Sequence, residues 1–497
     1  MTPNAWLPVA ILASSLLPGL VIFTLPEKAV VLRTTLNLGG AIVKILLLVL
    51  MMVGVFHGVV FEFRVPLVPG IDFALHADAL SLLFVNLSAV LWLATTIYAI
   101  GYLEGSPHRS RFFGYFSLCV TATVGLAMAG NLLTFLVFYE ALTLTTYPLV
   151  VHRESEVARR AGRLYLTYTL LGGVLLLTGT VWLYSLTGTL EFVDRGFVSE
   201  LGLDPAVLRA IFAVLILGVG VKAALVPLHG WLPRAMVAPA PVSALLHAVA
   251  VVKAGAFGIV RIVYDVFGVE FSAALGVTLP LAILAAITIV YGSVRALFQD
   301  NLKRRLAFST VSQVSYITLG VAIAGPIATI GGLVHLVHQG FMKITLFFCA
   351  GNYAEAAGVH KVSELAGIGR RMPWTTAAFT LAAVGMIGLP PMAGFVSKWF
   401  LALGGLEVHQ NWVPLLLLGS SVLNAAYFLP IIRTAWFDPP PDHWPVEARP
   451  GRLEAPLALL APPLATAAAA LLWGLFATVP GTPLDWVQLI AARKYGQ

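Results

Sequence analysis

Long apolar runs follow one another along almost the entire chain, and charged residues are confined mainly to the short segments between them. A helix that crosses the hydrocarbon core of a bilayer needs about 20 mostly apolar residues. Hydrophobic residues make up 59% of the chain and charged residues only 11%, whereas a soluble domain carries about 25% charged residues. The sequence therefore predicts an all-α polytopic membrane protein.

We expect about fourteen spanning helices on this length criterion, with no separate soluble domain. The predicted spans are residues 5–26, 35–60, 78–102, 112–129, 131–151, 164–186, 207–227, 240–264, 272–298, 304–324, 326–351, 374–403, 412–436 and 455–479. We divide the chain into an N-terminal hairpin with the third helix (1–111), a first five-helix repeat (112–267), a second repeat (268–437), and a last helix with its tail (438–497).

Lysine and arginine are unevenly distributed between the loops, and this predicts the orientation. The loops after odd-numbered helices hold most of them: Arg153, Arg159, Arg160, Arg163, Lys303, Arg304, Arg305, Arg370 and Arg371. The loops after even-numbered helices hold few: Arg64, Arg195, Arg209 and Arg261. Short cytoplasmic loops are enriched in Lys and Arg. We therefore expect the odd loops in the cytoplasm and both termini on the outer, periplasmic side of the inner (plasma) membrane, although Arg493 and Lys494 weigh against it.

The stretch from Gly218 to Gly255 carries two lysines in apolar segments on either side of a proline-rich turn. Lys222 precedes Pro227, and Lys253 follows His247 in the second segment. A lysine near the bilayer centre costs about 2.5–3.5 kcal/mol on insertion scales. Irregular backbone at this depth is tolerated only inside protein or beside a water-filled cavity. Two lysines beside a helix breaker therefore predict a place where ions, above all protons, cross.

A second proline break lies in the predicted twelfth helix. Pro390 and Pro391 interrupt this helix, and Lys398 follows the break. Paired broken helices in two halves of a chain indicate inverted repeats with a site at their interface. We expect helices 4–8 and 9–13 to be these repeats, with helices 7 and 12 in equivalent places. The alternative for Lys398 is a side chain that snorkels from a helix end.

Glu140 lies in the middle of the predicted fifth helix. A carboxyl group satisfied by hydroxyls such as that of Thr143 is one interpretation. Ionisable residues in spanning segments are functional by default, however. We predict that Glu140 faces Lys222, so that movement of the carboxylate relative to the ammonium drives the uptake or release of a proton.

The predicted eleventh helix holds three further ionisable residues, His335, His338 and Lys343. Two histidines and a lysine in one span favour a water-bridged proton path over three ordinary core residues. A metal at the histidine pair is an alternative, but no carboxylate or cysteine accompanies the pair in the span. We predict no metal site. We interpret Lys44, on the peripheral first hairpin, as a snorkelling residue, and His229 as either a gate or a capped loop residue.

The chain lacks the motifs of common redox and nucleotide sites. Its two cysteines, Cys119 and Cys349, are far apart and each lies in an apolar run. This pattern excludes the usual iron–sulfur and zinc sites. No GxGxxG follows a strand pattern. We expect no cofactor and no nucleic-acid partner, and the net charge of +7 is attributed to topology.

Five segments resemble the antiporter-like subunits shared by respiratory complex I, Mrp-type multisubunit sodium/proton antiporters and membrane-bound hydrogenases. They are NLLTFLVFYEALTLTTYPLV, VKAALVPLHGWLPRAMVAPAPVSALLHAVAVVKAG, DNLKRRLAFSTVSQVSYI, HLVHQGFMKITLFFCAG and GLPPMAGFVSKW. The resemblance implies a fourteen-helix core in a multisubunit membrane complex. It also implies roles in a proton relay: a switching pair, Glu140 and Lys222; a central part, His247, Lys253, His335, His338 and Lys343; and an exit, Lys398. We expect the carboxylate and the four lysines to form one polar row near the membrane midplane, with the histidines as bridges.

Within the family the chain looks most like the D-type component of Mrp antiporters. No long lateral helix is predicted after the last span, and Lys398 stands where one middle complex I subunit has a glutamate. A proton-translocating subunit, with sodium exchange left open, is therefore the predicted function. The alternatives are the pumping arm of an NADH-quinone oxidoreductase, hydrogenase or formate-oxidising complex, and the ion-coupling subunit of an inorganic-carbon uptake complex. Each requires other membrane subunits as partners, and whether the assembly is an enzyme depends on them.

Overall fold

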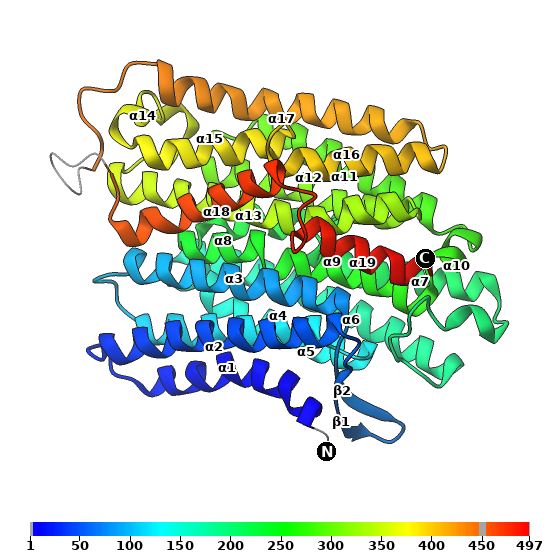
Figure 1. The fold of residues 1–497 in the computed structure, drawn as a ribbon. Helices are drawn as coiled ribbons and strands as arrows, with labels where there is room; N and C mark the ends of the chain where they lie inside the picture. The colour runs from blue at the N-terminus through cyan, green and yellow to red at the C-terminus, as the bar shows by residue number, and fades with distance from the viewer. Residues whose placement is uncertain (1–2, 447–453, 497) are drawn as a thin grey trace.

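A computed structural model describes residues 3–446 and 454–496 of the chain. Its helices run side by side in Figure 1, with α1 (Trp6–Thr24) and α2 (Val30–Phe56) along one edge and α17 (Trp412–Phe437) along the opposite edge. The part of the predicted C-terminal segment at 447–453 lies outside the described residues. The all-α membrane fold predicted from the apolar runs is confirmed.

The other long helices lie between these two edges. They are α3 (Ala79–Tyr102), α4 (Arg109–Ala127), α5 (Leu132–Val150), α6 (Glu156–Thr187), α7 (Pro205–Lys222), α8 (Ala240–Ala248), α9 (Val251–Arg261), α11 (Thr278–Leu297), α12 (Leu302–Ala322), α13 (Pro326–Ala357), α15 (Pro373–Ile387), α16 (Ala393–Glu407), α18 (Leu457–Leu475) and α19 (Pro483–Tyr495). The short helices are η1 (Pro3–Ala5), η2 (Val198–Leu201), η3 (Leu228–Trp231), η4 (Arg234–Val237), η5 (Ile262–Phe267), α10 (Val269–Ala274), η6 (Val362–Glu364) and α14 (Ile368–Arg371).

Eleven helices in the described ranges are long and apolar enough to cross a membrane, with α8, α9 and η5 taken together as one. Three further predicted spans coincide with α4, α12 and the broken pair α15–α16. The total of fourteen, the division at residues 111, 267 and 437, and the two inverted repeats stay predictions.

The innermost helices are α13 and the α8–α9 segment. In each of them, the most apolar stretch of 18 residues is 100% buried. The corresponding stretch in α2 and in α17 is only 33% buried. Both inner helices carry candidate lysines near their middles, Lys343 and Lys253. The fold therefore surrounds these lysines with other helices, so they do not face lipid.

The predicted single helix at 240–264 is wrong in one respect, because it is broken. Helix α8 ends at Ala248, and the amide of Ala250 donates to the carbonyl of Leu245, five residues back. Helix α9 then begins at Val251 and ends in the π-helical turn η5. Such i to i−5 bonds are rare and occur mostly as bulges at functional sites. The bulge lies between His247 and Lys253.

Several arginines assigned to a loop lie instead in the first turns of α6. The side chain of Ser155 accepts a hydrogen bond from the amide of Ala158 and starts this helix earlier than predicted. A serine at the N-cap satisfies one of the free amides of a helix end. Arg159 and Arg160 stay exposed at this end of the helix, so the charge asymmetry between the two faces is kept.

Two elements were not predicted from the sequence. Strands β1 (Phe61–Val68) and β2 (Ile71–Ala77) form an antiparallel hairpin at one end of the bundle (Figure 1). Gly70 has a φ of +84° in its turn, a conformation that glycine adopts at no steric cost. The second element is α19, which packs against α3 and α13.

Candidate functional site

Glu140 of α5 and Lys222 of α7 are electrostatic neighbours, but they do not form a close pair, and their role as a switch stays a prediction. The Lys222 ammonium donates to the backbone carbonyl of Tyr139 and lies 3.4 Å from the centre of the Tyr139 ring. The Glu140 and Lys222 charges interact electrostatically, yet the described residues show no ion pair between them within 4 Å. Oε1 of Glu140 is buried without a hydrogen-bond partner. The carboxylate and the ammonium are therefore neighbours with a gap between them.

Small residues let the neighbouring helices approach this pair closely. Gly173 of α6 lies directly against the Glu140 carboxylate, so that a Cβ at this position would overlap Oε1. Gly255 of α9 lies against the backbone of Lys222 and Ala223 in the same way. The second contact brings α9, which carries Lys253, against the end of α7.

Lys253 connects α9 to α13. Its side chain is fully buried, and its ammonium donates to the carbonyl of Leu336 at 2.9 Å. Leu336 is next to His335 in α13, and His335 interacts electrostatically with Lys253. Lys253 also interacts electrostatically with Lys343, two turns further along α13. Lys253 thus joins the α7 end of the site to the ionisable residues of α13.

Lys343 is held by hydroxyl and carbonyl oxygens of α12. Its ammonium donates to Ser309 Oγ at 2.8 Å and to the Leu306 carbonyl at 3.4 Å. Ser309 Oγ in turn accepts a hydrogen bond from the hydroxyl of Tyr427 in α17, at 2.9 Å. The ammonium therefore has polar partners from α12, and through Ser309 it is connected to a third helix.

The break between α15 and α16 holds Lys398. Its ammonium donates to the carbonyls of Met386 and Ile387, at 3.2 and 2.7 Å, and to Ser421 Oγ at 2.9 Å. These carbonyls are free because α15 ends at Ile387, where Gly388 takes a φ of +91°. Lys398 is 7% exposed, so it does not snorkel. Pro390 and Pro391 lie in the irregular turn between these two helices.

His335 and His338 take different roles in the packing. His335 Nδ1 shares a hydrogen bond of 2.8 Å with Ser397 Oγ, next to Lys398. His338 stacks on Trp473 of α18, with ring centroids 6.2 Å apart. The two rings thus face different helices, and within the described ranges no group of three metal-ligating side chains comes together. His335 interacts electrostatically with both Lys253 and Lys398, and its role as a bridge between them stays a prediction.

His247 lies at the end of α8, beside Lys343. Its ring stacks on Phe347 at 4.6 Å, and neither ring nitrogen has a hydrogen-bond partner among the described residues. It interacts electrostatically with Lys343 and with Lys303 at the start of α12. Lys303 donates to Ser243 Oγ, one turn before His247, at 3.2 Å. His247 therefore lies between the central lysines and one end of the bundle.

Pro227 lies in the irregular segment between α7, which ends at Lys222, and η3. The amide of Val226 is satisfied by Thr288 Oγ1 of α11 at 3.1 Å. His229 follows in η3, with its ring edge-on to that of Tyr291 at 4.8 Å. The proline therefore marks the break, but helix α7 already ends five residues before it.

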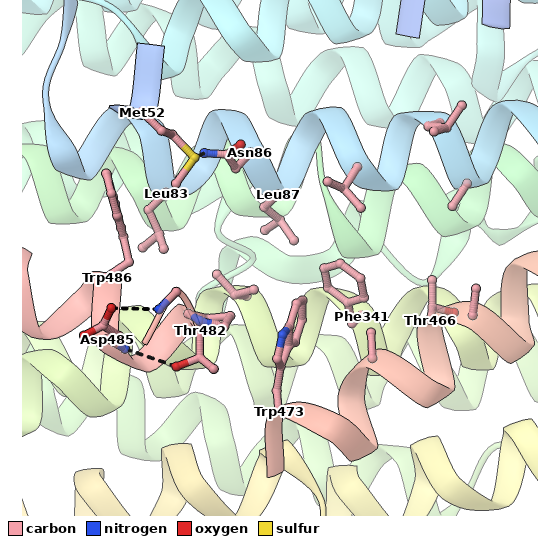
Figure 2. Close-up of a pocket in the computed structure, with 18 of the residues that line it drawn as sticks. Met52, Leu83, Asn86, Leu87, Phe341, Thr466, Trp473, Thr482, Asp485 and Trp486 are labelled. Carbon is pink, nitrogen blue, oxygen red and sulfur yellow. Dashed lines mark hydrogen bonds between the residues drawn. The ribbon is translucent and has the colours of Figure 1, made fainter. Parts of the chain in front are cut away.

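A cavity of about 920 Å³ is lined by residues such as Leu83, Phe341 and Trp473 (Figure 2). It is lined by α2, α3, α13, α18 and the start of α19, and none of the eight candidate residues lines it. Trp473 stands between this cavity and His338. The lining of this cavity is thus mainly apolar, and Trp473 is the lining residue that contacts His338.

Sequence reasoning missed the neutral residues that hold the lysines. Ser309, Ser397, Ser421 and the Tyr139 carbonyl are direct partners of the candidate residues. Gln313 of α12 donates to the Met386 carbonyl at 3.3 Å. The unusual polarity of the segment LAFSTVSQVSY was a signal for two of these partners. Backbone partners leave no such signal.

A network of buried ion pairs at one end of the bundle was also missed. The Arg261 guanidinium donates to Asp78 at 2.7 and 2.9 Å and to Asp265 at 2.6 Å. The Lys494 ammonium of α19 donates to Asp265 and to Asp194. The assignment of Arg261 to a loop was wrong, because it is the last residue of α9 and is 3% exposed. Lys494, which weighed against the predicted orientation, is neutralised by these aspartates.

The snorkelling interpretation of Lys44 was wrong. Its side chain is fully buried in the middle of α2. The ammonium donates to the Ile11 carbonyl at 3.0 Å and to Ser15 Oγ at 2.8 Å, both in α1. A snorkelling side chain would extend to a helix end instead.

Comparison with known proteins places this arrangement in a family. Residues 129–424 match the family model described as NADH:quinone oxidoreductase/Mrp antiporter, transmembrane region. Residues 69–113 match a second model, the N-terminus of chain 5 of NADH-ubiquinone oxidoreductase (complex I). The first match covers more than half of the chain. The chain belongs to this family.

Individual relatives support this family assignment. The N subunit of the NADH-quinone oxidoreductase of Desulforudis audaxviator is 37% identical over 406 residues, covering 78% of this chain and 79% of that protein. The D component of the Na⁺/H⁺ antiporter of Bacillus subtilis is 29% identical over 377 residues, covering 74% and 75%. The L subunit of the Mycobacterium tuberculosis NADH-quinone oxidoreductase is 33% identical, and the match spans 65% of that longer protein.

Solved structures show the same fold. A chain of the Mrp complex of Dietzia sp. DQ12-45-1b superposes with a TM-score of 0.89 and 26% identity, covering 100% of this chain and 98% of that chain. These relatives are subunits of multisubunit membrane complexes. The predicted family membership is confirmed. The relatives include both respiratory and antiporter subunits, so they do not favour the D-type Mrp component alone.

Proposed function

We propose that this chain is the ion-translocating membrane subunit of a multisubunit complex, and that protons move through it along the row Glu140, Lys222, Lys253, Lys343 and Lys398. The observation that carries the proposal is the state of the four lysines. Each is buried, and none has a carboxylate within 4 Å among the described residues. Each is held instead by carbonyl or hydroxyl oxygens.

Such a lysine is costly as a permanent charge. An ammonium at the bilayer centre costs about 2.5–3.5 kcal/mol on insertion scales. A chain that needed only packing would gain from an apolar residue of similar volume at each of these positions. Carbonyl and hydroxyl oxygens accept from either a neutral amine or an ammonium, so a lysine held by them can exchange its proton without losing its partners.

The unpartnered polar atoms along the row support a hydrated path. Oε1 of Glu140, both nitrogens of His247, Nε2 of His335 and the side-chain oxygen of Gln313 are buried without partners in the described structure. Buried polar groups of this kind are ordinarily hydrogen-bonded, if not to protein then to ordered water. Waters at these atoms would bridge the lysines that do not touch one another.

The proposed switch is a change in the distance between the Glu140 carboxylate and the Lys222 ammonium. When the carboxylate approaches the ammonium, the proton is held on Lys222; when it moves away, the proton passes toward Lys253. His335 relays between Lys253 and Lys398 through Ser397, and His247 connects Lys343 to the end of the bundle where Lys303 lies. The ring of His338 stacks on Trp473. Its Nδ1 has no hydrogen-bond partner in the described structure and would bind a water molecule of the relay.

The orientation and location are part of the proposal. The face with Arg159, Arg160 and Arg304 would be cytoplasmic in a cell inner membrane, and both termini would lie outside. Arg304 is exposed, with its amide capped by Asn301. A cysteine at Arg304 should therefore react with an impermeant thiol reagent only after the cells are opened. Labelling in intact cells would overturn this orientation.

The test of translocation uses the whole complex, isolated with its native partners and reconstituted in vesicles. The Glu140→Ala and Lys222→Ala variants should still assemble but should lose ion transport. Lys361→Met is the control, because Lys361 is 57% exposed and pairs only with Glu364 in the described structure. Near-normal transport by both switch variants would overturn the proposal.

Identification of the partners separates the related functions. Partners that carry flavin or iron–sulfur clusters would make the chain the pumping arm of a redox complex, as its 37% identity to part of an NADH-quinone oxidoreductase suggests. Small membrane subunits alone would indicate an Mrp-type sodium/proton antiporter, which the Dietzia structure suggests. Soluble carbon-binding partners would indicate an inorganic-carbon uptake complex. Flux measured with and without sodium would show whether sodium is exchanged.

A further inference from the structure

Lys44 is a buried cation that the proposed relay does not use. It is the fifteenth of the 27 residues of α2 and is fully buried. Its ammonium donates to the Ile11 carbonyl and to Ser15 Oγ, in the middle of α1. Ser15 Oγ shares a second hydrogen bond, of 2.8 Å, with Thr121 Oγ1 of α4. The side chain thus sits in a polar pocket built by two other helices.

Among the described residues, no carboxylate forms an ion pair with Lys44. Helix α2 packs against α1 and α3 and touches α4. Neither α1 nor α3 contains a charged residue, and the two arginines of α4, Arg109 and Arg111, lie in its first turn. Arg33, the other charged residue of α2, lies three turns before Lys44. The nearest aromatic partner is Trp92, whose ring centre is 5.3 Å from the ammonium.

The pocket repeats the construction around Lys343. In both, the ammonium donates to a carbonyl and, at 2.8 Å, to a serine hydroxyl about one turn later on a neighbouring helix. In both, that serine hydroxyl is hydrogen-bonded to a hydroxyl of a third helix: Tyr427 beyond Ser309, and Thr121 beyond Ser15. Two unrelated parts of the chain therefore present a lysine in the same set of neutral oxygens.

Lys44 also lies where the row would continue beyond Glu140, because it is near the middle of its helix and close to the helices next to α5. It is central in its helix, as Glu140 is in α5 and Lys343 is in α13. Helix α4 packs between α1 and α5. Its Cys119, on the side away from Thr121, approaches Thr146 Oγ1 of α5 at 3.5 Å. One helix therefore separates the Lys44 pocket from the helix that carries Glu140.

We propose that Lys44 is a further proton-exchanging group of this subunit, positioned by Ser15 and Thr121, which extends the row beyond Glu140 into the N-terminal hairpin. The proposal rests on the function proposed above. In the exchange, one N–H bond of the ammonium breaks and one O–H bond forms on a water molecule, which leaves a neutral amine and a hydronium ion. The hydroxyls of Ser15 and Thr121 stay bonded in both states.

The main test compares three substitutions of Lys44 in the reconstituted complex. Lys44→Met removes the titrating group, and Lys44→Arg keeps a charge that proteins do not deprotonate. Both should lower proton flux per assembled complex by at least about tenfold, a smaller factor than the about 10²–10⁴ ascribed to positioned general acids and bases. Lys44→His should retain flux, with the alkaline limb of its pH profile moved to lower pH, because histidine holds its proton more weakly than lysine.

A structural role gives different results. Lys44→Met and Lys44→Arg would then change thermal stability while flux per complex and its pH profile stayed as in the unmodified chain, and this outcome would overturn the proposal. If the Lys44→Arg variant does not assemble, the flux of the Lys44→Met variant decides, because methionine fills the pocket without a charge.

A matched pair on α4 gives a second measurement. Thr121 and Thr123 both donate to the carbonyl four residues back, at 3.0 and 2.9 Å, but only Thr121 reaches Ser15. Thr121→Val should lower the flux, and Thr123→Val should not. Equal flux in the two variants would contradict the positioning role of Thr121.

The Glu140→Ala variant separates this proposal from the proposed function. Loss of flux in Glu140→Ala with unchanged flux in Lys44→Met would overturn the role of Lys44 alone. Unchanged flux in both variants would overturn translocation along the row as well.

Discussion

Two sets of buried cations in this chain are stabilised in opposite ways. At one end of the bundle, Arg261 and Lys494 are paired with Asp78, Asp265 and Asp194. In the middle of the bundle, the four lysines of the row have only neutral oxygens as partners in the described structure. Both sets are buried among packed helices, so burial alone does not distinguish them.

The two sets differ in the cost of removing a proton from the cation. In the paired network, removal of a proton from a cation would leave aspartates buried without a counter-charge, which is costly. In the row, each lysine keeps its hydrogen bonds in either protonation state. The paired network is therefore suited to hold helices together, and the row is suited to change charge. Arg261 joins α9 to α3, and Lys494 joins α19 to η5 and to the segment around Asp194.

The largest expected effect on proton flux concerns the row. Lys343→Met should lower proton flux by at least about tenfold, equivalent to about 1.4 kcal/mol on the barrier. Its thermal stability should be equal or higher, because an apolar side chain of similar volume does not carry the desolvation cost of an unpaired buried charge. Flux in vesicles and the melting temperature of the purified complex measure the two effects. A marked loss of stability with normal flux would place Lys343 with the paired network instead.

The next effect concerns the network. Asp265→Asn removes the carboxylate shared by Arg261 and Lys494 and should destabilise the subunit by about 3–5 kcal/mol, as expected when one partner of a buried ion pair is removed. Flux per correctly assembled complex should stay near that of the unmodified chain. Thermal unfolding in detergent measures the loss. A variant of normal stability that does not transport ions would show that the network belongs to the path.

The smallest effect concerns the exposed edge of the same network. Asp194 is 67% exposed, whereas Asp265 is 1% exposed. Asp194→Asn should therefore cost no more than about 1 kcal/mol, the range of surface ion pairs. It is the matched control for Asp265→Asn, because both aspartates accept from the Lys494 ammonium. Equal destabilisation by the two variants would mean that burial does not set the strength of this network.

The candidate residues of the proposed row stand out in the sequence because ionisable residues are rare in apolar runs. Glu140, Lys222, Lys253, Lys343 and Lys398 were each identified by this contrast, and the proline breaks marked where free carbonyls would be found. The network was not predictable in the same way. Asp265 and Lys494 are 229 residues apart in the chain, and both lie near helix ends, where charged residues are ordinary. Only the fold brings them together.

Lys44 shows that an ionisable residue can stand out in an apolar run and still be misinterpreted. It stands in an apolar run as clearly as Lys253 does, but its position on the first hairpin suggested a peripheral, lipid-facing residue. Helices α1, α3 and α4 cover it completely. The β-hairpin at 61–77 was missed for a related reason, since its short alternating segment lies between two much stronger helical patterns.

The break between α15 and α16 also limits how the chain can change by mutation. A Cβ on Gly388 would meet the Lys398 side chain at 2.5 Å, so a larger residue there would displace the lysine. A change of Lys398 to an apolar residue would remove the donor of the Ile387 carbonyl, whereas the Met386 carbonyl would keep its hydrogen bonds from Gln313 and Asn424. The lysine, the glycine and the unwound turn thus depend on one another. A mutation that moves or removes this charge therefore also disturbs the unwound turn that holds it.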